Sequence, residues 1–576
     1  MSAVHKLITD HLDIWTAADT EKKSGRGRAS GNANSVYGIK KLRELILELA
    51  VRGKLVPQDA SDEPASSLLQ KISIHKSELI SVGRQKKETQ SSPIKEGEKR
   101  FKLPIGWEWV RFGDALINRD AERKPIAAGH RQDRKGLYDY YGASGVIDKI
   151  DEYLFDKPLL LIGEDGANLV NRSTPIAFIA RGKYWVNNHA HVLDGFSEDY
   201  LRYIELFVNA IDLKPFVTGT AQPKMNQAKM NSIVLAIPPE AEQHRIVAKV
   251  DELMALCDQL EAQHNNAADA HEQLVSHLLS TLTQSQDAED FNANWQRIAT
   301  HFDTLFTTES SIDALKQTLL QLAVMGKLVP QDPNDEPASQ LLKRIQNEKA
   351  KLVAEGKIRK DKPSTMIEES EKNFALPRGW KWVRFNDYAT DVSTGPFGSM
   401  IHQSDYVDGG VPLINPSHMI DDRITPDWSV SVSTDMAATL ETYKIYEGDI
   451  VMARRGEVGR IALVTKHESG WLCGTGSFVL RFSVEVLRDY LRVFFRCEYA
   501  RTYLAGEAVG TTMVNLNHGI LKKMPIGLPP LEEQHRIVAK VDELIDLCEQ
   551  LKHRIKNTRQ QQQKLARTLI EHALVA

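Results

Sequence analysis

The chain carries the same set of short phrases twice, and this duplication constrains the fold more than any other feature. Residues 49–72 (LAVRGKLVPQDASDEPASSLLQKI) return with few changes at 322–345, a GWxWVRF phrase follows each copy, and EQHRIVAKVDEL begins at both Glu242 and Glu533. Repeats of this size are too long for a solenoid and indicate a gene-scale duplication. Because the segments between the phrases barely match, the sequence predicts one duplicated framework holding two divergent modules.

The composition is that of a globular protein with several domains. A chain of 576 residues, 42% hydrophobic and 26% charged, has room for about three or four domains of ~150 residues. No apolar run reaches the ~20 residues that span a bilayer, and the N-terminus lacks the apolar core of a signal peptide. The four cysteines form no C-x-x-C pair, and we expect buried thiols. We therefore expect a cytoplasmic protein that does not associate with a membrane.

Changes in residue composition and hydrophobic pattern along the chain predict five regions. Short β-branched and aromatic runs predict an α+β or mainly β fold for two modules, module 1 and module 2. Helical patterns dominate the other regions, of which the first and third each contain a copy of the first repeat. The regions are residues 1–100, 101–240 (module 1), 241–373, 374–530 (module 2) and 531–576.

A long helix with a heptad pattern is predicted after each module. Its apolar residues recur in steps of four and three, which is typical of helices that pair along their length. A helix of ~40 residues extends ~60 Å and would suit a strut between two modules. The seam residues are Ile246, Val250, Leu253, Cys257 and Leu260 in the first helix and Ile537, Val541, Leu544, Cys548 and Leu551 in the second.

No motif in the sequence supports catalysis. The chain has no G-x-x-x-x-G-K-[ST] loop, no complete dinucleotide-binding fingerprint and no Asn-Pro-Pro-aromatic motif of adenine methylation. His189 and His191 would project to one face of a strand, but no second pair of ligands accompanies them. We expect packing or DNA contact there and no metal site. The sequence favours a binding protein over an enzyme.

Three pairs of loops in corresponding places of the modules are candidates for DNA contact. LLLIGEDG lies opposite DIVMARRG, YYGASGVIDK opposite LINPSHMIDD, and each module ends in a GT…N loop. In the first pair two carboxylates replace two arginines; carboxylates accept from cytosine N4, whereas arginine donates to guanine. Turns that only cap a strand are the alternative. The candidates are Tyr140, Tyr141, Ser144, Glu164, Asp165, Lys224 and Asn226 in module 1 and Asn415, Ser417, His418, Arg454, Arg455 and Asn517 in module 2.

These phrases resemble the specificity subunit of type I restriction-modification enzymes. The resemblance rests on the GKLVPQ and DEPAS phrases, on PP-x-x-EQ-x-RIV-x-KVDEL and on the two divergent modules, and it covers essentially the whole chain. It implies an α+β fold with two mixed α/β target recognition domains. Two long helices would join these domains as an antiparallel coiled coil, and the whole would have an internal pseudo-two-fold repeat.

The same resemblance implies a non-catalytic subunit that recognises a bipartite, asymmetric site in double-stranded DNA. Two methyltransferase subunits and two restriction subunits are the implied partners. S-adenosylmethionine, ATP and magnesium would belong to those partners, and this chain would hold no cofactor. A coiled-coil adaptor that binds only protein and a fused restriction-modification polypeptide with an unrecognised catalytic domain are the alternative functions.

Overall fold

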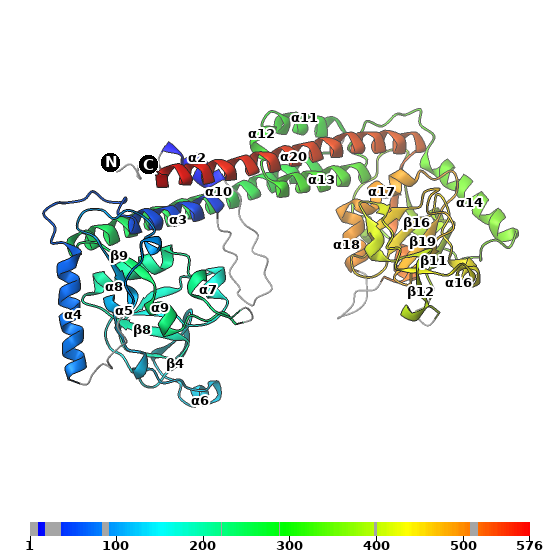
Figure 1. Cartoon of the computed structure of the whole chain (residues 1–576). Helices are drawn as coiled ribbons and strands as arrows, with labels where there is room; N and C mark the ends of the chain where they lie inside the picture. Colours follow the sequence, from blue (N-terminus) through cyan, green and yellow to red (C-terminus); the bar gives the residue numbers. More distant parts are fainter. Residues whose placement is uncertain are drawn as a thin grey trace. The chain divides into compact units, whose positions relative to one another are not determined.

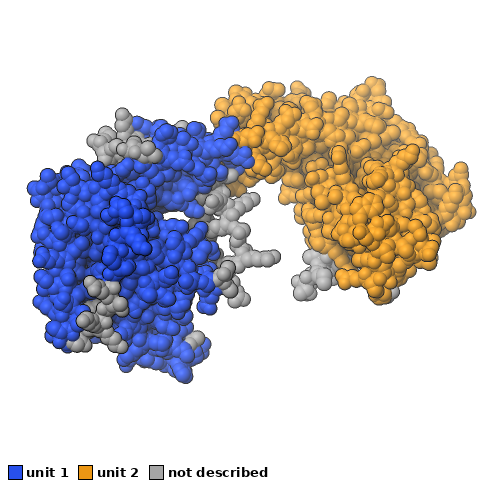
Figure 2. Space-filling view, viewed as in Figure 1, with its two compact units in different colours: residues 1–267, 558–576 blue, residues 268–557 orange. Residues whose placement is uncertain are grey.

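The protein consists of two compact units, each with one module and a set of helices (Figure 2). Unit 1 comprises residues 1–267 and 558–576, and unit 2 comprises residues 268–557. The duplication in the sequence is therefore a duplication in the structure. The computed structural model describes residues 10–17, 36–82, 91–219, 222–286, 288–396, 400–506 and 516–575.

Unit 1 begins with helices, continues as a module of short strands and ends in a long helix (Figure 1). Its elements are α2 (Leu12–Ala17), α3 (Tyr37–Val51), α4 (Ala65–Ser81), β1 (Glu108–Arg111), α5 (Phe112–Ala115), β2 (Ile117–Asn118), α6 (Ala128–Gln132), β3 (Tyr138–Gly142), β4 (Gly145–Ile150), β5 (Leu159–Gly163), α7 (Asn168–Asn171), β6 (Ala177–Ala180), β7 (Tyr184–Val186), β8 (Ala190–Asp194), α8 (Glu198–Ala210), α9 (Gln227–Asn231), β9 (Val234–Ile237) and α10 (Glu240–Thr283).

Unit 2 repeats this order with a different module. Its elements are α11 (Ala288–Ala299), α12 (Phe302–Leu305), α13 (Glu309–Val324), α14 (Ala338–Ala354), β10 (Lys381–Arg384), α15 (Phe385–Tyr388), β11 (Asp391–Thr394), β12 (Tyr406–Ile414), β13 (Met419–Ile420), β14 (Arg423–Ile424), β15 (Ser431–Val432), α16 (Thr434–Thr439), β16 (Ile450–Ala453), β17 (Ile461–Leu463), β18 (Leu472–Cys473), β19 (Ser477–Arg481), α17 (Arg488–Arg496), α18 (Glu498–Gly506), α19 (His518–Lys523), β20 (Pro525–Leu528) and α20 (Leu531–Val575).

The modules share one sheet topology, which confirms the predicted α+β fold with an internal repeat. Module 1 has a four-stranded sheet in the order β2-β8-β5-β6, and module 2 has the matching order β11-β19-β16-β17. In each module the first and last strands pair with each other, β1 with β9 and β10 with β20. The chain therefore enters and leaves each module at the same place. The central strand β5 is buried along its whole length, as its continuous apolar run LLLIG predicts.

In unit 1 three of the repeated phrases meet at one buried carboxylate. Glu242, which is 1% exposed, accepts hydrogen bonds from Trp107 Nε1 at 2.9 Å and Gln58 Nε2 at 2.7 Å. One turn along α10, Arg245 pairs with Asp62 at 2.5 Å. Burial raises the pKa of Glu242, and the two hydrogen bonds partly oppose that shift. These contacts join the GKLVPQ, DEPAS, GWxWVRF and EQHRIV phrases.

Unit 2 reproduces this arrangement with the second copy of each phrase. Glu533 accepts from Trp380 Nε1 and from Gln331 Nε2, both at 2.9 Å. Arg536 pairs with Asp335 at 2.6 Å. The phrases are therefore alike in sequence because they contact one another in the same way in both units.

The two long helices are confirmed at 44 and 45 residues, and each of them contributes residues to both units. Within unit 1, Arg43 of α3 pairs with Asp258 and Glu261 of α10. Lys54 donates to the carbonyl oxygen of Leu574 at the end of α20. A cation at a helix C-terminus satisfies a free carbonyl and stabilises the helix dipole.

The corresponding contacts in unit 2 have the same geometry. Lys316 of α13 pairs with Glu549 of α20, and Lys327 donates to the carbonyl oxygen of Thr283, the last residue of α10, at 3.1 Å. Each unit therefore combines one of the shorter helices α3 and α13 with the start of one long helix and the end of the other.

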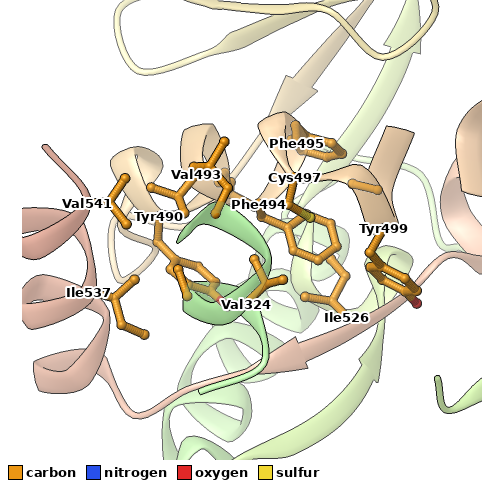
Figure 3. Packing of buried hydrophobic residues seen from close by; sticks show 14 of the residues in the cluster. Val324, Tyr490, Val493, Phe494, Phe495, Cys497, Tyr499, Ile526, Ile537 and Val541 are labelled. Carbon is orange, nitrogen blue, oxygen red and sulfur yellow. The ribbon is translucent and has the colours of Figure 1, made fainter. Parts of the chain in front are cut away.

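The residues of the heptad seam lie in the hydrophobic cores of this chain. Ile246, Val250, Leu253 and Cys257 are at most 1% exposed and pack with α3. Their counterparts in α20 belong to one cluster with residues of α13 and α17, and Figure 3 shows Ile537 and Val541 beside Tyr490. Leu260, Leu544 and Leu551 are partly buried against the same clusters. A partner subunit would have to contact other faces of these helices.

The remaining features of the fold concern thiols and membranes. All four cysteines are free and buried, as expected, and burial raises the pKa of Cys473 to about 12. No helix within the described ranges is long and apolar enough to cross a membrane.

Replacing Trp107 with Phe should destabilise unit 1 by about 1–3 kcal/mol, because Glu242 then loses a buried hydrogen bond. The pKa of Glu242 is raised on folding, so its burial costs stability as the pH rises above the ordinary glutamate value of 4.5. The mutation removes a donor that lowers this pKa, and the loss should therefore be larger at pH 8 than at pH 5. Urea unfolding followed by circular dichroism measures it.

Trp109→Phe is the matched control, because Trp109 belongs to the same phrase and packs on Phe101. Equal losses in W107F and W109F at both pH values would show that the carboxylate contact has no special role.

Candidate nucleic-acid interface

The three candidate loops of module 1 lie together at the end of β5. The backbone N–H of Glu164 donates to His189 O at 2.8 Å, and Glu164 O accepts from Met225 N at 2.8 Å. The turn of the β3–β4 hairpin is also adjacent, since a Cβ added at Gly163 would lie 2.7 Å from Ala143 O. We name this set of loops loop cluster 1.

Module 2 has an equivalent loop cluster 2 at the end of β16. Arg454 N–H donates to Gly476 O at 3.0 Å, and Leu516 N–H donates to Arg454 O at 2.9 Å. The loop after β12 is adjacent, since a Cβ added at Gly476 would lie 3.0 Å from Pro416 Cδ. The matching backbone bonds place Arg454 at the position of Glu164, as the sequence comparison predicts. Residues 510–515 of the second GT…N loop lie outside the described residues.

Glu164 is enclosed by cations of its own module. Its carboxylate lies 2.9 Å from Arg123 Nη1 and 3.2 Å from Lys224 Nζ, and His191 Nδ1 is 3.9 Å away. Burial acts to raise the pKa of Glu164, but the hydrogen bond from Arg123 and the charge of His191 outweigh it and the pKa is lowered. The prediction that this carboxylate accepts from a base is not supported, because protein donors already surround it.

His191 is part of the same buried network. It is 1% exposed, its Nδ1 lies 2.6 Å from Asp120 and its Nε2 lies 2.9 Å from Met225 O. Both ring nitrogens therefore have oxygen partners, and we assign this residue to packing. The described residues include no group of three or more His, Cys, Asp or Glu side chains that could hold a metal ion.

The other candidates of module 1 differ in how accessible they are. Tyr140 is fully buried, which corrects its assignment as a DNA-contacting residue, and Tyr141 stacks on Phe178. Asn226 caps α9 by accepting from Lys229 N, so its amide oxygen is occupied. Ser144 at the hairpin turn is exposed, as is about half of the side chain of Lys224.

Of the two adjacent arginines in loop cluster 2, Arg454 is partly buried and Arg455 is exposed. It forms no hydrogen bond or ion pair with any other residue within the described ranges. The guanidinium of Arg454 lies 5.3 Å from the centre of the Phe478 ring, a cation–π contact that fixes its direction. Burial is the main cause that lowers the pKa of Arg454.

The remaining candidates of module 2 have structural contacts. His418 is mostly buried, and its Nδ1 accepts from Asn415 N at 3.3 Å; burial lowers its pKa. Asn517 caps α19 by accepting from Ile520 N. Ser417 is exposed at the loop after β12. The candidate loops thus meet in each module, but several of their polar side chains hold the loops themselves together.

The arginines of residues 119–135 are paired with carboxylates. Arg119 pairs with Glu122 and Asp194, Arg131 with Asp148, and Arg134 with Asp151. This stretch looks basic in the sequence, but its charge is largely neutralised in the fold.

The sequence predicts packing or DNA contact for His189, but it does not indicate which residue is its partner. Its Nδ1 lies 2.8 Å from Asp165, and about half of its side chain is exposed. The HAH run in the sequence draws attention to His189. Nothing in the sequence, however, predicts that Asp165, 24 residues earlier, is its partner.

Comparison with known proteins identifies the family. The family model of the type I restriction modification DNA specificity domain matches residues 104–269 and 378–558, which are module 1 and module 2 with the helices that follow them. This chain belongs to the type I restriction-modification specificity subunits. The type I restriction enzyme EcoEI specificity subunit of Escherichia coli is 38% identical over 622 residues, covering 99% of this chain and 100% of the relative.

Other specificity subunits are also similar. The EcoAI specificity subunit of Escherichia coli is 38% identical over 609 residues, covering 99% of this chain and all of the relative. Among solved structures, the HsdS subunit from Thermoanaerobacter tengcongensis is 18% identical with a TM-score of 0.39, covering 83% of this chain and 98% of that one.

Glu164→Ala should destabilise module 1 by about 1–3 kcal/mol, since Arg123 loses its 2.9 Å pairing with this carboxylate and keeps the longer ion pair with Asp120. Because the pKa of Glu164 is lowered on folding, this loss should be present at neutral pH and shrink as the pH falls below the ordinary value of 4.5. Thermal unfolding at two pH values measures it.

Arg455→Ala is the control at the equivalent loop of module 2, and we expect a change within ~0.5 kcal/mol for an exposed side chain. If E164A is as stable as R455A, Glu164 is not a structural residue and is available to a ligand.

Proposed function

We propose that this specificity subunit recognises a bipartite, asymmetric site in double-stranded DNA, one half through each module. The observation that carries the proposal is that one backbone arrangement presents unlike side chains in loop cluster 1 and loop cluster 2. Loop cluster 1 presents Lys224 and His189 around paired carboxylates, whereas loop cluster 2 presents the exposed Arg455. Donors and acceptors at matched positions favour different base edges in the major groove.

We also propose that two methyltransferase subunits and two restriction subunits assemble with this chain. The relatives are named as subunits of type I restriction enzymes, which supports assembly with other subunits. In that assembly the catalysis, with its S-adenosylmethionine, ATP and magnesium, would belong to the partners, and this chain would supply the specificity. Since α10 and α20 each contribute residues to both units, we expect their lengths to set the spacer between the half-sites.

Exchanging residues 104–240 for the module of a relative should change one half of the recognised site. The other half and the spacer should stay the same, because the β1–β9 pair lets the chain enter and leave the module at one place. Sequencing of methylated DNA from cells that express the chimera gives the result. If both halves change together, the modules are not independent readers.

Arg455→Ala should relax the preference at one base pair of the second half-site and cost about 1–3 kcal/mol of binding energy if this side chain contacts guanine. If it contacts a phosphate, affinity should instead fall evenly for all sequences and the salt dependence should weaken by about one ion. Affinities for single-base variants of the site at two salt concentrations separate these results.

Lys381→Ala is the control, because Lys381 is an exposed cation on the framework strand β10. If R455A and K381A behave alike, loop cluster 2 has no role in recognition.

A further inference from the structure

A histidine–aspartate pair at the surface of loop cluster 1 has no role in the framework. His189 Nδ1 lies 2.8 and 3.0 Å from the two carboxylate oxygens of Asp165. The His189 side chain is 49% exposed and that of Asp165 is 18% exposed. Across the described ranges, neither side chain forms an ion pair with any other residue. The neighbouring Glu164, in contrast, is closed off by its cations.

The backbone at His189 is fixed on both sides. Its N–H donates to Asn187 Oδ1 at 2.8 Å, and its carbonyl oxygen accepts from Glu164 N at 2.8 Å. Asn187 is 3% exposed, and its own N–H donates to Tyr141 O at 3.1 Å. The ring is therefore carried by a rigid loop between β7 and β8, and Asp165 sets its orientation. A side chain held in this way is suited to recognition of a small polar group.

The carboxylate determines what the exposed edge of the ring can do. An ionised carboxylate only accepts hydrogen bonds, so the proton of the neutral imidazole lies on Nδ1 of His189 and Nε2 carries the lone pair. In this neutral form of the ring, Nε2 is therefore the acceptor. In the major groove the donors that a single acceptor can meet are the exocyclic amino groups, adenine N6 and cytosine N4.

We propose that His189 is a specificity-determining residue of module 1. Its Nε2 accepts a hydrogen bond from the amino group of one adenine or cytosine in the first half-site, and Asp165 is the positioning residue for the ring. This inference rests on the proposed function of module 1 as a reader of double-stranded DNA.

Module 2 lacks this pair for a steric reason. The position of His189 is taken by Gly476, since both carbonyls accept from the residue that follows the central strand. A Cβ at Gly476 would lie 3.0 Å from Pro416 Cδ, so the loop has little room for a side chain. The position of Asp165 is taken by Arg455. One cluster therefore presents an acceptor where the other presents a donor, and the two half-sites should differ in sequence.

The test measures DNA binding by the full chain in complex with its methyltransferase partners. The probes are duplexes of the recognised site in which one adenine of the first half-site is replaced by purine, which lacks the 6-amino group, or one cytosine by 2-pyrimidinone. We expect the wild-type complex to bind the modified duplex roughly 3- to 10-fold more weakly than the unmodified duplex at one such position. This is the contribution of one hydrogen bond.

His189→Ala should lose this sensitivity and keep its discrimination throughout the second half-site. Asp165→Asn should reduce the sensitivity at the same position, since an amide no longer fixes the ring proton on Nδ1. His75→Ala is the matched control, because His75 on α4 is a half-exposed histidine with an acidic neighbour, Glu78. It should retain the wild-type sensitivity.

Two results would overturn the proposal. If H189A remains as sensitive as the wild type to every missing amino group, His189 does not read a base. If the position that H189A relaxes responds instead to 7-deazaguanine, the ring acts as a donor and the assigned acceptor role is wrong. Both results leave site-specific binding by the wild type intact, whereas failure of the proposed function would appear as no preference for the site at all. Even if a variant does not fold, a wild-type complex that is insensitive to every missing amino group of the first half-site would overturn the proposal.

Discussion

The hydrogen-bonded carboxylate of Glu242, repeated as Glu533, is the contact on which the rest of the structure depends. A buried carboxylate without donors is costly, and here an indole and an amide from two other phrases supply them. One side chain of the long helix thus fixes the strand that opens the module and the turn that precedes α4. The fold can tolerate different modules because this junction lies at the boundary of each module, away from the loops that differ.

The modules use the framework as a fixed base for loops that differ. The backbone bonds at the ends of β5 and β16 are the same, but the side chains there are a carboxylate network in one module and an arginine on a phenylalanine ring in the other. A change of recognition therefore needs no change of backbone. The two modules differ instead in side-chain packing: Glu164 has cations of its own module around it, whereas the loop at Gly476 has little room for a side chain.

Much of this architecture could be predicted from the sequence, because the repeated phrases mark the boundaries of the modules and their heptads predict the long helices. The sequence also predicts that Glu164 and Arg454 occupy equivalent positions, since both follow an apolar strand. Contacts between residues that are far apart in the sequence could not be predicted. Nothing in the pattern shows that Val250 lies in the core of its own unit, that Tyr140 is buried, or that Asp165 binds His189. Polar residues in a loop look alike whether they hold the loop or face a ligand.

The central claim is that one framework carries two independent readers of unlike sequence. The most direct measurement is sequencing of the methylated bases in DNA from cells whose only type I system contains this chain. The account predicts methylated adenines in a motif of two different half-sequences separated by a spacer of fixed length and free sequence. A continuous motif, or a palindrome with identical halves, would contradict it.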